Sequence, residues 1–263
     1  MSDGILTEID AGVGLVTLDR PDRHNAFDDA LIRSLTAAFS AMERDSSVRV
    51  VVLGSRGGSF CAGADLNWMK RAAGYGPEET RRDTLDLAAM LRAACEMSKP
   101  VVARVQGPAY GGGVGLIAAC DIAIATYDAQ FALSEVKLGI IPAVISPYVI
   151  GAIGARRARR YMLTAERFSA AEAYRIGLVH EIVPGEAELD EALGEIVDAL
   201  LGNGPAALGE CKALIRAVEN RPVGDELVEE TAERIGRVRA SAEAREGMAA
   251  FLEKRKPSWL RGQ

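Results

Sequence analysis

Histidine and cysteine are scarce in this sequence, which argues against most metal and disulfide chemistry. Only two histidines occur in 263 residues, so a histidine-based metal site is not expected, and no acidic cluster has the spacing of a metal-binding loop. The four cysteines lie far apart, without a Cys-x-x-Cys pair: Cys61, Cys95, Cys120 and Cys211. This usage predicts buried free thiols and a reducing, cytoplasmic environment.

Basic runs and long apolar segments are also missing. The net charge is −6 and no cluster of Lys and Arg occurs, so neither nucleic acid nor an anionic membrane surface is an expected partner. The most apolar segment, residues 111–126, is interrupted by Asp121 and is too short to cross a bilayer. The first ten residues hold three acidic and no basic side chains, which is not the pattern of a signal peptide.

Apolar runs and helical periodicity alternate through the first two thirds of the chain. Two strands are expected within residues 5–21, around a turn at Ala11 and Gly12, and the later apolar runs predict strands at 48–55, 100–107, 121–126 and 178–183. Helical patterns cover 28–42, 83–97, 112–120, 155–164, 170–176 and 188–201, and then 206–218, 224–240 and 242–254. Such alternation predicts an α/β core with parallel strands. The helical last third must cover this core or pack against another chain.

Two segments of very small residues follow apolar runs, "SFCAGADLNWM" at 59–69 and "YGGGVG" at 110–115. A helix N-terminus exposes unpaired N–H groups, and small residues let a ligand approach them. Two such loops together can place two donors on one oxygen, which is an oxyanion hole. For one loop alone, tight packing is the alternative interpretation. The spacing of a dinucleotide fingerprint is not clean, and the P-loop pattern is absent.

With the motifs around them, the two loops resemble the enoyl-CoA hydratase/isomerase (crotonase) superfamily. The resemblance begins at "LDRPDRHNAF" (18–27) and continues through "FALSEVKLGIIP" (131–142), "RFSAAEAYRIGLVHEIVP" (167–184) and "EGMAAFLEKRKP" (246–257). It implies a crotonase-like spiral of strand–strand–helix turns over residues 1–200 and an all-helical trimerisation region over residues 201–263. Two motifs, "GADLNWMKR" and "IIPAVISPYVIGAIG", are most similar to bacterial methylglutaconyl-CoA hydratases of leucine and isoprenoid breakdown.

The resemblance also implies a substrate and a reaction centre. The substrate is an acyl-CoA, with coenzyme A part of the substrate and no separate cofactor. The N–H groups of Ala64 and Gly112 would hold the thioester oxygen while an enolate-like state forms, and Glu135 would carry the proton. Hydratases of the family have another glutamate at the position that is Gly115 here. Hydration and double-bond isomerisation by a single glutamate therefore both stay open.

The residues around Glu135 support this role independently. Its neighbours at 131–141 are mainly apolar, and such surroundings raise the pKa of a carboxyl toward neutrality and suit acid–base catalysis. The alternative is a surface glutamate paired with Lys137. Three nearby polar groups are candidates to assist Glu135: Tyr110, Asn67 and Tyr148. The segments 83–97 and 143–148 are expected to shape the acyl pocket.

By the same resemblance, a further set of residues binds the substrate and its CoA: Arg23, Ala26, Ala62, Asp65, Leu66, Gly115, Phe251 and Lys254. Arg23 could instead lie in a solvated turn, and Asp65 could be a helix cap. Phe251 and Lys254 match a tail that reaches the CoA of a neighbouring subunit in a homotrimer or homohexamer. In their alternative interpretation, Phe251 is packed and Lys254 solvated on an amphipathic helix. His24 is interpreted as a turn residue.

Two other classes of protein are alternatives to an acyl-CoA enzyme. Some serine proteases share the spiral fold, but neither histidine is placed for a catalytic triad and no Gly-x-Ser-x-Gly motif occurs. A non-catalytic CoA-binding or scaffold protein would keep both N–H loops, but it would not need Glu135.

Overall fold

A six-stranded sheet forms the centre of the first part of the chain, in a computed structural model that describes residues 4–260. Its spatial order is β1-β2-β3-β4-β6-β9. The strands are β1 (Ile5–Asp10), β2 (Val13–Leu18), β3 (Val50–Ser55), β4 (Val101–Val105), β6 (Ile122–Thr126) and β9 (Glu181–Val183). Only the β1–β2 pair is antiparallel, and each later pair is parallel. The predicted α/β core with parallel strands is therefore confirmed.

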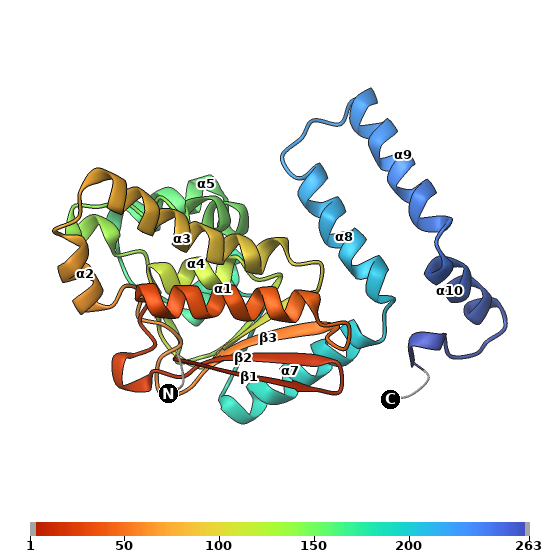
Figure 1. Cartoon of the computed structure of the whole chain (residues 1–263), viewed down its shortest axis with the longest axis horizontal. Helices are drawn as coiled ribbons and strands as arrows, with labels where there is room; N and C mark the ends of the chain where they lie inside the picture. The colour runs from red at the N-terminus through yellow and green to blue at the C-terminus, as the bar shows by residue number, and fades with distance from the viewer. Residues whose placement is uncertain (1–3, 261–263) are drawn as a thin grey trace.

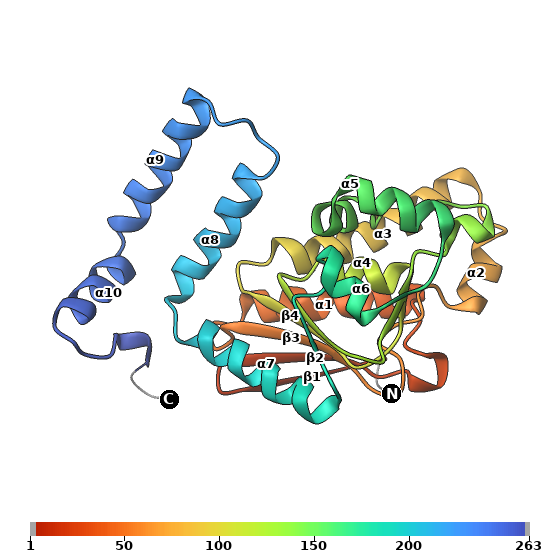
Figure 2. The same cartoon turned by 180° about the vertical axis from the view of Figure 1, so that it is seen from behind.

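Helices cover both faces of this sheet, which explains why β3 is apolar from Val50 to Leu53. All six residues of β3 are buried. Val51 and Leu53 belong to the main core, which α1 (Asp29–Arg44) and α3 (Pro77–Glu96) help to form. Val50 and Val52 pack on the other face against α7 (Glu186–Leu201). Figures 1 and 2 show α1 and α3 on one side of the sheet and α7 on the other.

A second, small sheet was not predicted. It consists of β5 (Ala109–Tyr110), β7 (Gln130–Ala132) and β8 (Phe168–Ser169), in the order β5-β7-β8. Strands of two or three residues are too short to show an alternating pattern. Their pairing is important for the site, because Tyr110 lies in register with Ala132. This brings the second glycine loop beside the segment that leads to Glu135.

Most predicted helices occur, with shifted boundaries. A short helix, α2 (Leu66–Ala72), precedes α3, which begins at Pro77 and not at residue 83. The helix expected at 155–164 begins earlier, as α5 (Ser146–Thr164), and is interrupted at Gly154, whose φ is 76°. The remaining helices of the core are α4 (Gly112–Ala118) and α6 (Ala170–Ile176).

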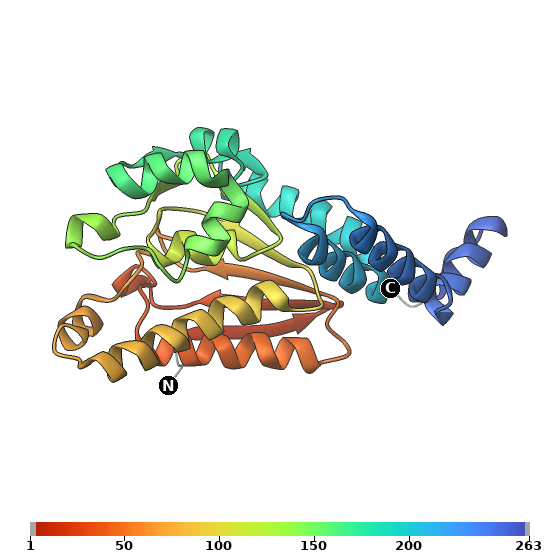
Figure 3. The same cartoon turned by 90° about the horizontal axis from the view of Figure 1, so that it is seen from above.

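The last helices form an arm that extends away from the core (Figures 1 and 3). It contains α8 (Pro205–Val218), α9 (Asp225–Arg239) and α10 (Ala242–Leu252), and no strand follows β9 within residues 4–260. Arg49 binds both ends of the arm, because its guanidinium donates to the carbonyls of Leu201 and Asn203 at 2.8 Å and of Trp259 at 3.3 Å. Lys212 on α8 forms a second anchor, with Nζ 2.5 Å from Oδ2 of Asp121.

Apart from these anchors, the arm presents many apolar side chains to solvent in the single chain. The large exposed ones are Ile215, Val223, Val228, Ile235, Met248, Phe251 and Leu252. None of the described helices is both long and apolar enough to cross a membrane. Over the same residues, no group of three or more His, Cys, Asp and Glu side chains could hold a metal ion. All four cysteines are free, but the prediction that they are buried is wrong for Cys211, which is exposed; Cys61 is buried, and Cys95 and Cys120 are partly buried.

Candidate active site

The two loops of small residues lie side by side, held by short bridges of parallel backbone pairing. Cys61 pairs with Ala109, and the N–H of Tyr110 donates to the carbonyl of Cys61 at 2.9 Å. On its other side the first loop is paired to Phe27, which bridges to Ala64. The segment 61–64 is therefore fixed between residue 27 and the start of α4.

This pairing leaves the N–H group of Ala64 free to bind a ligand. In the bridge, Phe27 donates to the carbonyl of Gly63 at 2.6 Å and accepts from the N–H of Asp65 at 2.7 Å. The N–H of Ala64 consequently points away from Phe27, and no acceptor for it is found within residues 4–260. Gly112 is the first residue of α4, so its N–H has no partner in the helix either.

The close approach of the two loops explains why residue 63 is a glycine. Gly63 has a φ of +85°, and a Cβ atom built on it would lie 2.9 Å from the carbonyl oxygen of Tyr110 and 3.8 Å from the nitrogen of Gly112. A side chain at position 63 would thus separate the two loops. One expectation needs correction here: Ala64 is not at a helix terminus, because α2 begins at Leu66 with Asp65 as its N-cap. Strand-like pairing with Phe27 orients its donor instead.

Glu135 begins a short 3-10 helix (Glu135–Leu138) and its carboxylate lies against the second loop. A Cβ built on Gly111 would be 3.1 Å from Oε1 of Glu135. Oε2 is buried and has no hydrogen-bond partner within the described residues. Burial raises the pKa of the Glu135 carboxyl above its ordinary value, as the apolar neighbours predicted. The alternative of a surface glutamate paired with Lys137 is wrong, because Oε2 of Glu135 is buried without a hydrogen-bond partner.

Position 115, where the family's hydratases have a second glutamate, is closed by an apolar side chain. A Cβ built on Gly115 would lie only 2.1 Å from Cγ2 and 2.5 Å from Cβ of Ile145. Ile145 is 3% exposed and precedes α5. It belongs to the segment 143–148 that was expected to shape the acyl pocket. Gly115 itself is buried and offers no side chain to a ligand.

Asp65 is a structural residue of the first loop. Its Oδ1 accepts hydrogen bonds from the N–H groups of Asn67 at 2.8 Å and Trp68 at 3.1 Å, so it caps α2. Its Oδ2 lies 3.7 Å from Arg23 and 3.9 Å from Arg20. Asp65 is only 6% exposed, which makes it a buried cap with two cationic neighbours.

Replacing Asp65 by alanine should destabilise the protein and disturb the first loop. Losing the cap alone is expected to reduce the free energy of unfolding by about 0.5–2 kcal/mol. Chemical denaturation of the variant gives this value directly. Asp22→Ala is the matched control, because the Asp22 side chain is 77% exposed and its pair with Arg23 should contribute little. Equal stability of the two variants would contradict the assignment.

Asn25 organises the same region and was missed by sequence reasoning. It is fully buried, and its Oδ1 accepts from the N–H of Arg20 at 2.8 Å. Its Nδ2 donates to the carbonyls of Arg56 and Ser59, each at 2.9 Å. Its φ of 54° is one that asparagine tolerates better than most residues. His24 beside it is an exposed turn residue, as predicted.

The other predicted CoA-binding residues fall into two groups that do not meet within one chain. Ala26 is buried, Ala62 is partly exposed, and Arg23 and Leu66 are exposed, all near the first loop. Phe251 and Lys254 belong to the arm, at the opposite end of the molecule from α2 (Figures 1 and 3). Phe251 is 82% exposed, so the alternative in which it packs within its own chain is wrong.

The candidate assistants of Glu135 lie in different surroundings. Asn67 is exposed on α2. The ring of Tyr110 faces the Arg167 guanidinium, whose carbon is 5.4 Å from the ring centroid. Tyr148 lines a cavity of about 350 Å³ whose lining does not include Glu135. Within the described residues, no hydrogen bond joins any of the three to the Glu135 carboxylate, whose Oε2 is left without a partner.

The raised pKa of Glu135 has a consequence for stability. A carboxyl with a raised pKa in the folded state contributes stability below its unfolded pKa, near 4.5, and loses it as the pH rises through the folded value. Glu135→Gln does not titrate. The melting temperature of the variant minus that of the wild type should therefore increase as the pH rises from about 4.5 through the raised pKa of Glu135. Calorimetry across this range tests the expectation, and a difference independent of pH would contradict it.

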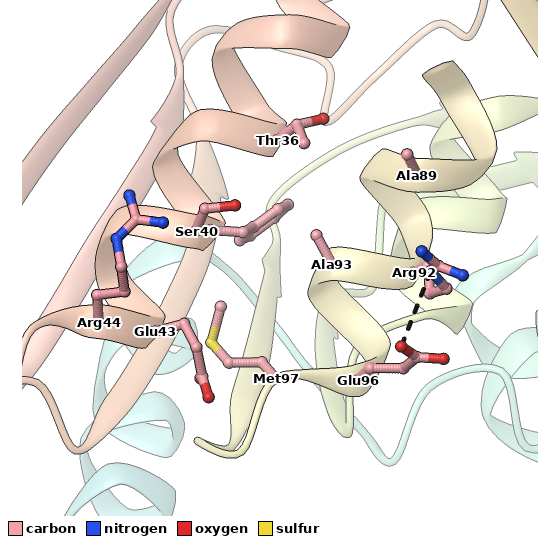
Figure 4. A pocket seen from close by; sticks show the side chains of 10 residues that line it. Thr36, Ser40, Glu43, Arg44, Ala89, Arg92, Ala93, Glu96 and Met97 are labelled. Atoms are coloured by element: carbon pink, nitrogen blue, oxygen red, sulfur yellow. Dashed lines mark ion pairs between the residues drawn. The ribbon is translucent and has the colours of Figure 1, made fainter. Parts of the chain in front are cut away.

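A groove between α1 and α3 is shown in Figure 4 and is separate from this site. It has a volume of about 420 Å³ and contains an ion pair between Arg92 and Glu96 at 3.8 Å. None of its ten lining residues is Ala64, Gly112 or Glu135. The groove therefore lies apart from the candidate active site.

Comparisons with known proteins agree with the geometry. The model of the enoyl-CoA hydratase/isomerase family matches residues 8–262. Enoyl-CoA hydratase EchA19 of Mycobacterium tuberculosis is 34% identical, over 93% of this chain and 92% of its own. The 1,2-epoxyphenylacetyl-CoA isomerase of Escherichia coli is 32% identical, over 98% and 99%. A crystal structure of an enoyl-CoA hydratase from Shewanella pealeana superposes with a TM-score of 0.95 at 43% identity, covering 97% and 96%.

Proposed function

Because the chain belongs to the enoyl-CoA hydratase/isomerase family, we propose that it acts on an acyl-CoA thioester with Glu135 as its single acid–base group. The observation that carries this proposal is the buried, unpartnered Oε2 of Glu135 beside the glycine loop. A buried carboxylate oxygen without a hydrogen-bond partner is costly, and a bound substrate would account for its position.

In the proposed mechanism, the N–H groups of Ala64 and Gly112 bind the thioester oxygen. They stabilise the negative charge that grows there as the enolate forms. Glu135 accepts a proton from a water molecule while the water oxygen adds to C3 of a 2-enoyl-CoA. It then returns this proton to C2, and the product has gained one water. The carboxylate ends in its starting state, so one glutamate suffices.

Isomerisation is the second candidate, and the apolar closure of position 115 favours it. In this reaction Glu135 removes a proton from C2 of a 3-enoyl-CoA and returns it to C4, while the double bond moves to C2. No water takes part. The contact between Gly115 and Ile145 removes the place where a second carboxylate would hold water. The same oxyanion donors serve both reactions.

A panel of 2-enoyl-CoA and 3-enoyl-CoA substrates, with products identified by mass spectrometry and chromatography, separates the candidates. A gain of one water identifies hydration, and a changed retention at unchanged mass identifies isomerisation. Binding of CoA without turnover of any member would leave a non-catalytic CoA-binding protein. We include methylglutaconyl-CoA in the proposal as the substrate to test first, because of the motifs at 63–71 and 140–154. A cytoplasmic location is proposed from the four free cysteines.

We also propose that the arm packs against other copies of the chain, as a homotrimer or a homohexamer of two trimers. The support is the set of seven large apolar side chains that the arm leaves exposed in one chain. In such an assembly Phe251 and Lys254 can reach the CoA bound to a neighbour, although they are remote from the loops of their own chain.

Light scattering should give a molar mass about three or six times the 28.0 kDa of one chain. The apolar arm makes association favourable, because each exposed side chain is removed from water. The measurement is made at several protein concentrations, so that a weak equilibrium is detected. A stable 28.0 kDa species at all concentrations would contradict the proposed assembly.

A further inference from the structure

Ile145 occupies the space into which a side chain at position 115 would project. The distances of 2.1 and 2.5 Å from a Cβ at position 115 are shorter than any two carbon atoms tolerate without bonding. Ile145 is buried in the main core cluster, and its carbonyl accepts from the N–H of Val149 at 3.0 Å in the first turn of α5. It therefore has little freedom to move aside.

Position 115, which faces Ile145, lies one helical turn from position 111, which faces Glu135. The N–H of Gly115 donates to the carbonyl of Gly111 at 3.2 Å, which places these two glycines one turn apart. A Cβ at 111 would meet the Glu135 carboxylate, and a Cβ at 115 would meet Ile145. Glu135 and Ile145 thus approach the same stretch of backbone, one with a carboxylate and the other with a branched alkyl group.

We infer that Ile145 is a specificity-determining residue, which keeps the site to one carboxylate by filling the place that a second one at position 115 would need. The inference rests on the proposed function. It assigns to Ile145 the exclusion of a second acid–base group and of the water that such a group would hold. Substrate near position 115 then contacts hydrocarbon, and every proton transfer depends on Glu135.

Four proteins test the inference: the wild type, Gly115→Glu, Ile145→Ala and the double variant. Gly115→Glu should lower the melting temperature and reduce kcat at least tenfold, because the new side chain displaces Ile145. The double variant should have a kcat at least tenfold higher than that of Gly115→Glu, so that the effects of the two substitutions are not additive. The kcat–pH profile of the double variant should also contain a second ionisation, which the wild type and Ile145→Ala lack. A merely structural role of Ile145 would not change that profile.

A matched control shows that the effect comes from the position and not from glutamate itself. Gly194 lies on the exposed side of α7, and nothing is within 4 Å of a Cβ built there. Gly194→Glu should leave the melting temperature at or above that of the wild type. If Gly115→Glu does not fold, Gly115→Ala with and without Ile145→Ala repeats the cycle with a single methyl group.

The inference is overturned if Gly115→Glu behaves as the wild type in melting temperature and kcat, or if Ile145→Ala restores neither. Restored stability with an unchanged pH profile would also overturn it, because Ile145 would then only fill space. If the wild type converts none of the enoyl-CoA substrates, the proposed function fails separately. The melting temperatures of the variants still decide whether Ile145 closes position 115.

Discussion

Replacing Glu135 by glutamine should lower kcat by a factor of about 10²–10⁴, the usual contribution of a positioned acid–base group. Glutamine keeps the size of the side chain, but it cannot accept and return a proton. The carboxylate of Asp65 caps α2, and position 115 is a glycine closed by Ile145, so neither position replaces Glu135. The substrate should still bind, because backbone donors hold the thioester. Steady-state kinetics and calorimetric titration with a CoA thioester measure the two effects separately.

Glu195→Gln is the matched control for this variant. Glu195 is exposed on α7, on the face of the sheet away from the site, so its kinetics should equal those of the wild type. Full activity of Glu135→Gln would refute the mechanism for hydration and for isomerisation alike. Loss of both activity and thioester binding would mean that Glu135 acts on binding rather than on proton transfer.

Replacing Ala64 by proline should reduce the rate by a factor of about 10²–10³, the cost of removing one oxyanion-hole donor. Proline has no N–H, so the thioester oxygen would keep only the donor of Gly112. The carbonyl of Gly63 and the N–H of Asp65, which bind Phe27, are unaffected by the missing proton. Ala64 is exposed, which leaves room for the ring.

Ala64→Gly is the appropriate comparison, because it removes the side chain and keeps the N–H. It should retain most of the activity. Circular dichroism and melting temperature must show that the proline variant is folded. If that variant is folded and turns over substrate at nearly the wild-type rate, the loop has only a structural role.

The sequence predicted the strands of the large sheet that are continuous apolar runs. An unbroken apolar run such as 48–55 indicates a strand covered on both faces, and that is how β3 is buried. Strands β5 and β8 could not be predicted, because two residues carry no periodicity and only their partners make them strands. Helix α5 was predicted too short, since Gly154 and Pro147 break its pattern and the packing of α4 against it does not appear in the sequence.

For the site, the resemblance predicted the roles of Glu135, Ala64 and Gly112, and apolar neighbours alone predicted the raised pKa of Glu135. Asn25 acts through hydrogen bonds to residues 31 and 34 positions away. Ile145 closes a position that lies 30 residues away in the sequence. No local pattern marks such contacts. Asp65 was left open between cap and ligand, and the structure shows the cap with two arginines close by.

The guanidinium of Arg49 makes the arm difficult to remove by truncation. Burial lowers the pKa of Arg49, and its Nε is buried without a partner, so the carbonyls of Leu201, Asn203 and Trp259 are its main compensation. A chain cut after residue 200 would leave this cation beside the sheet with its acceptors gone. An engineer who wants a smaller protein should instead excise residues from the middle of the arm and rejoin its two ends. Such an internal deletion keeps the acceptors of Arg49 at both junctions.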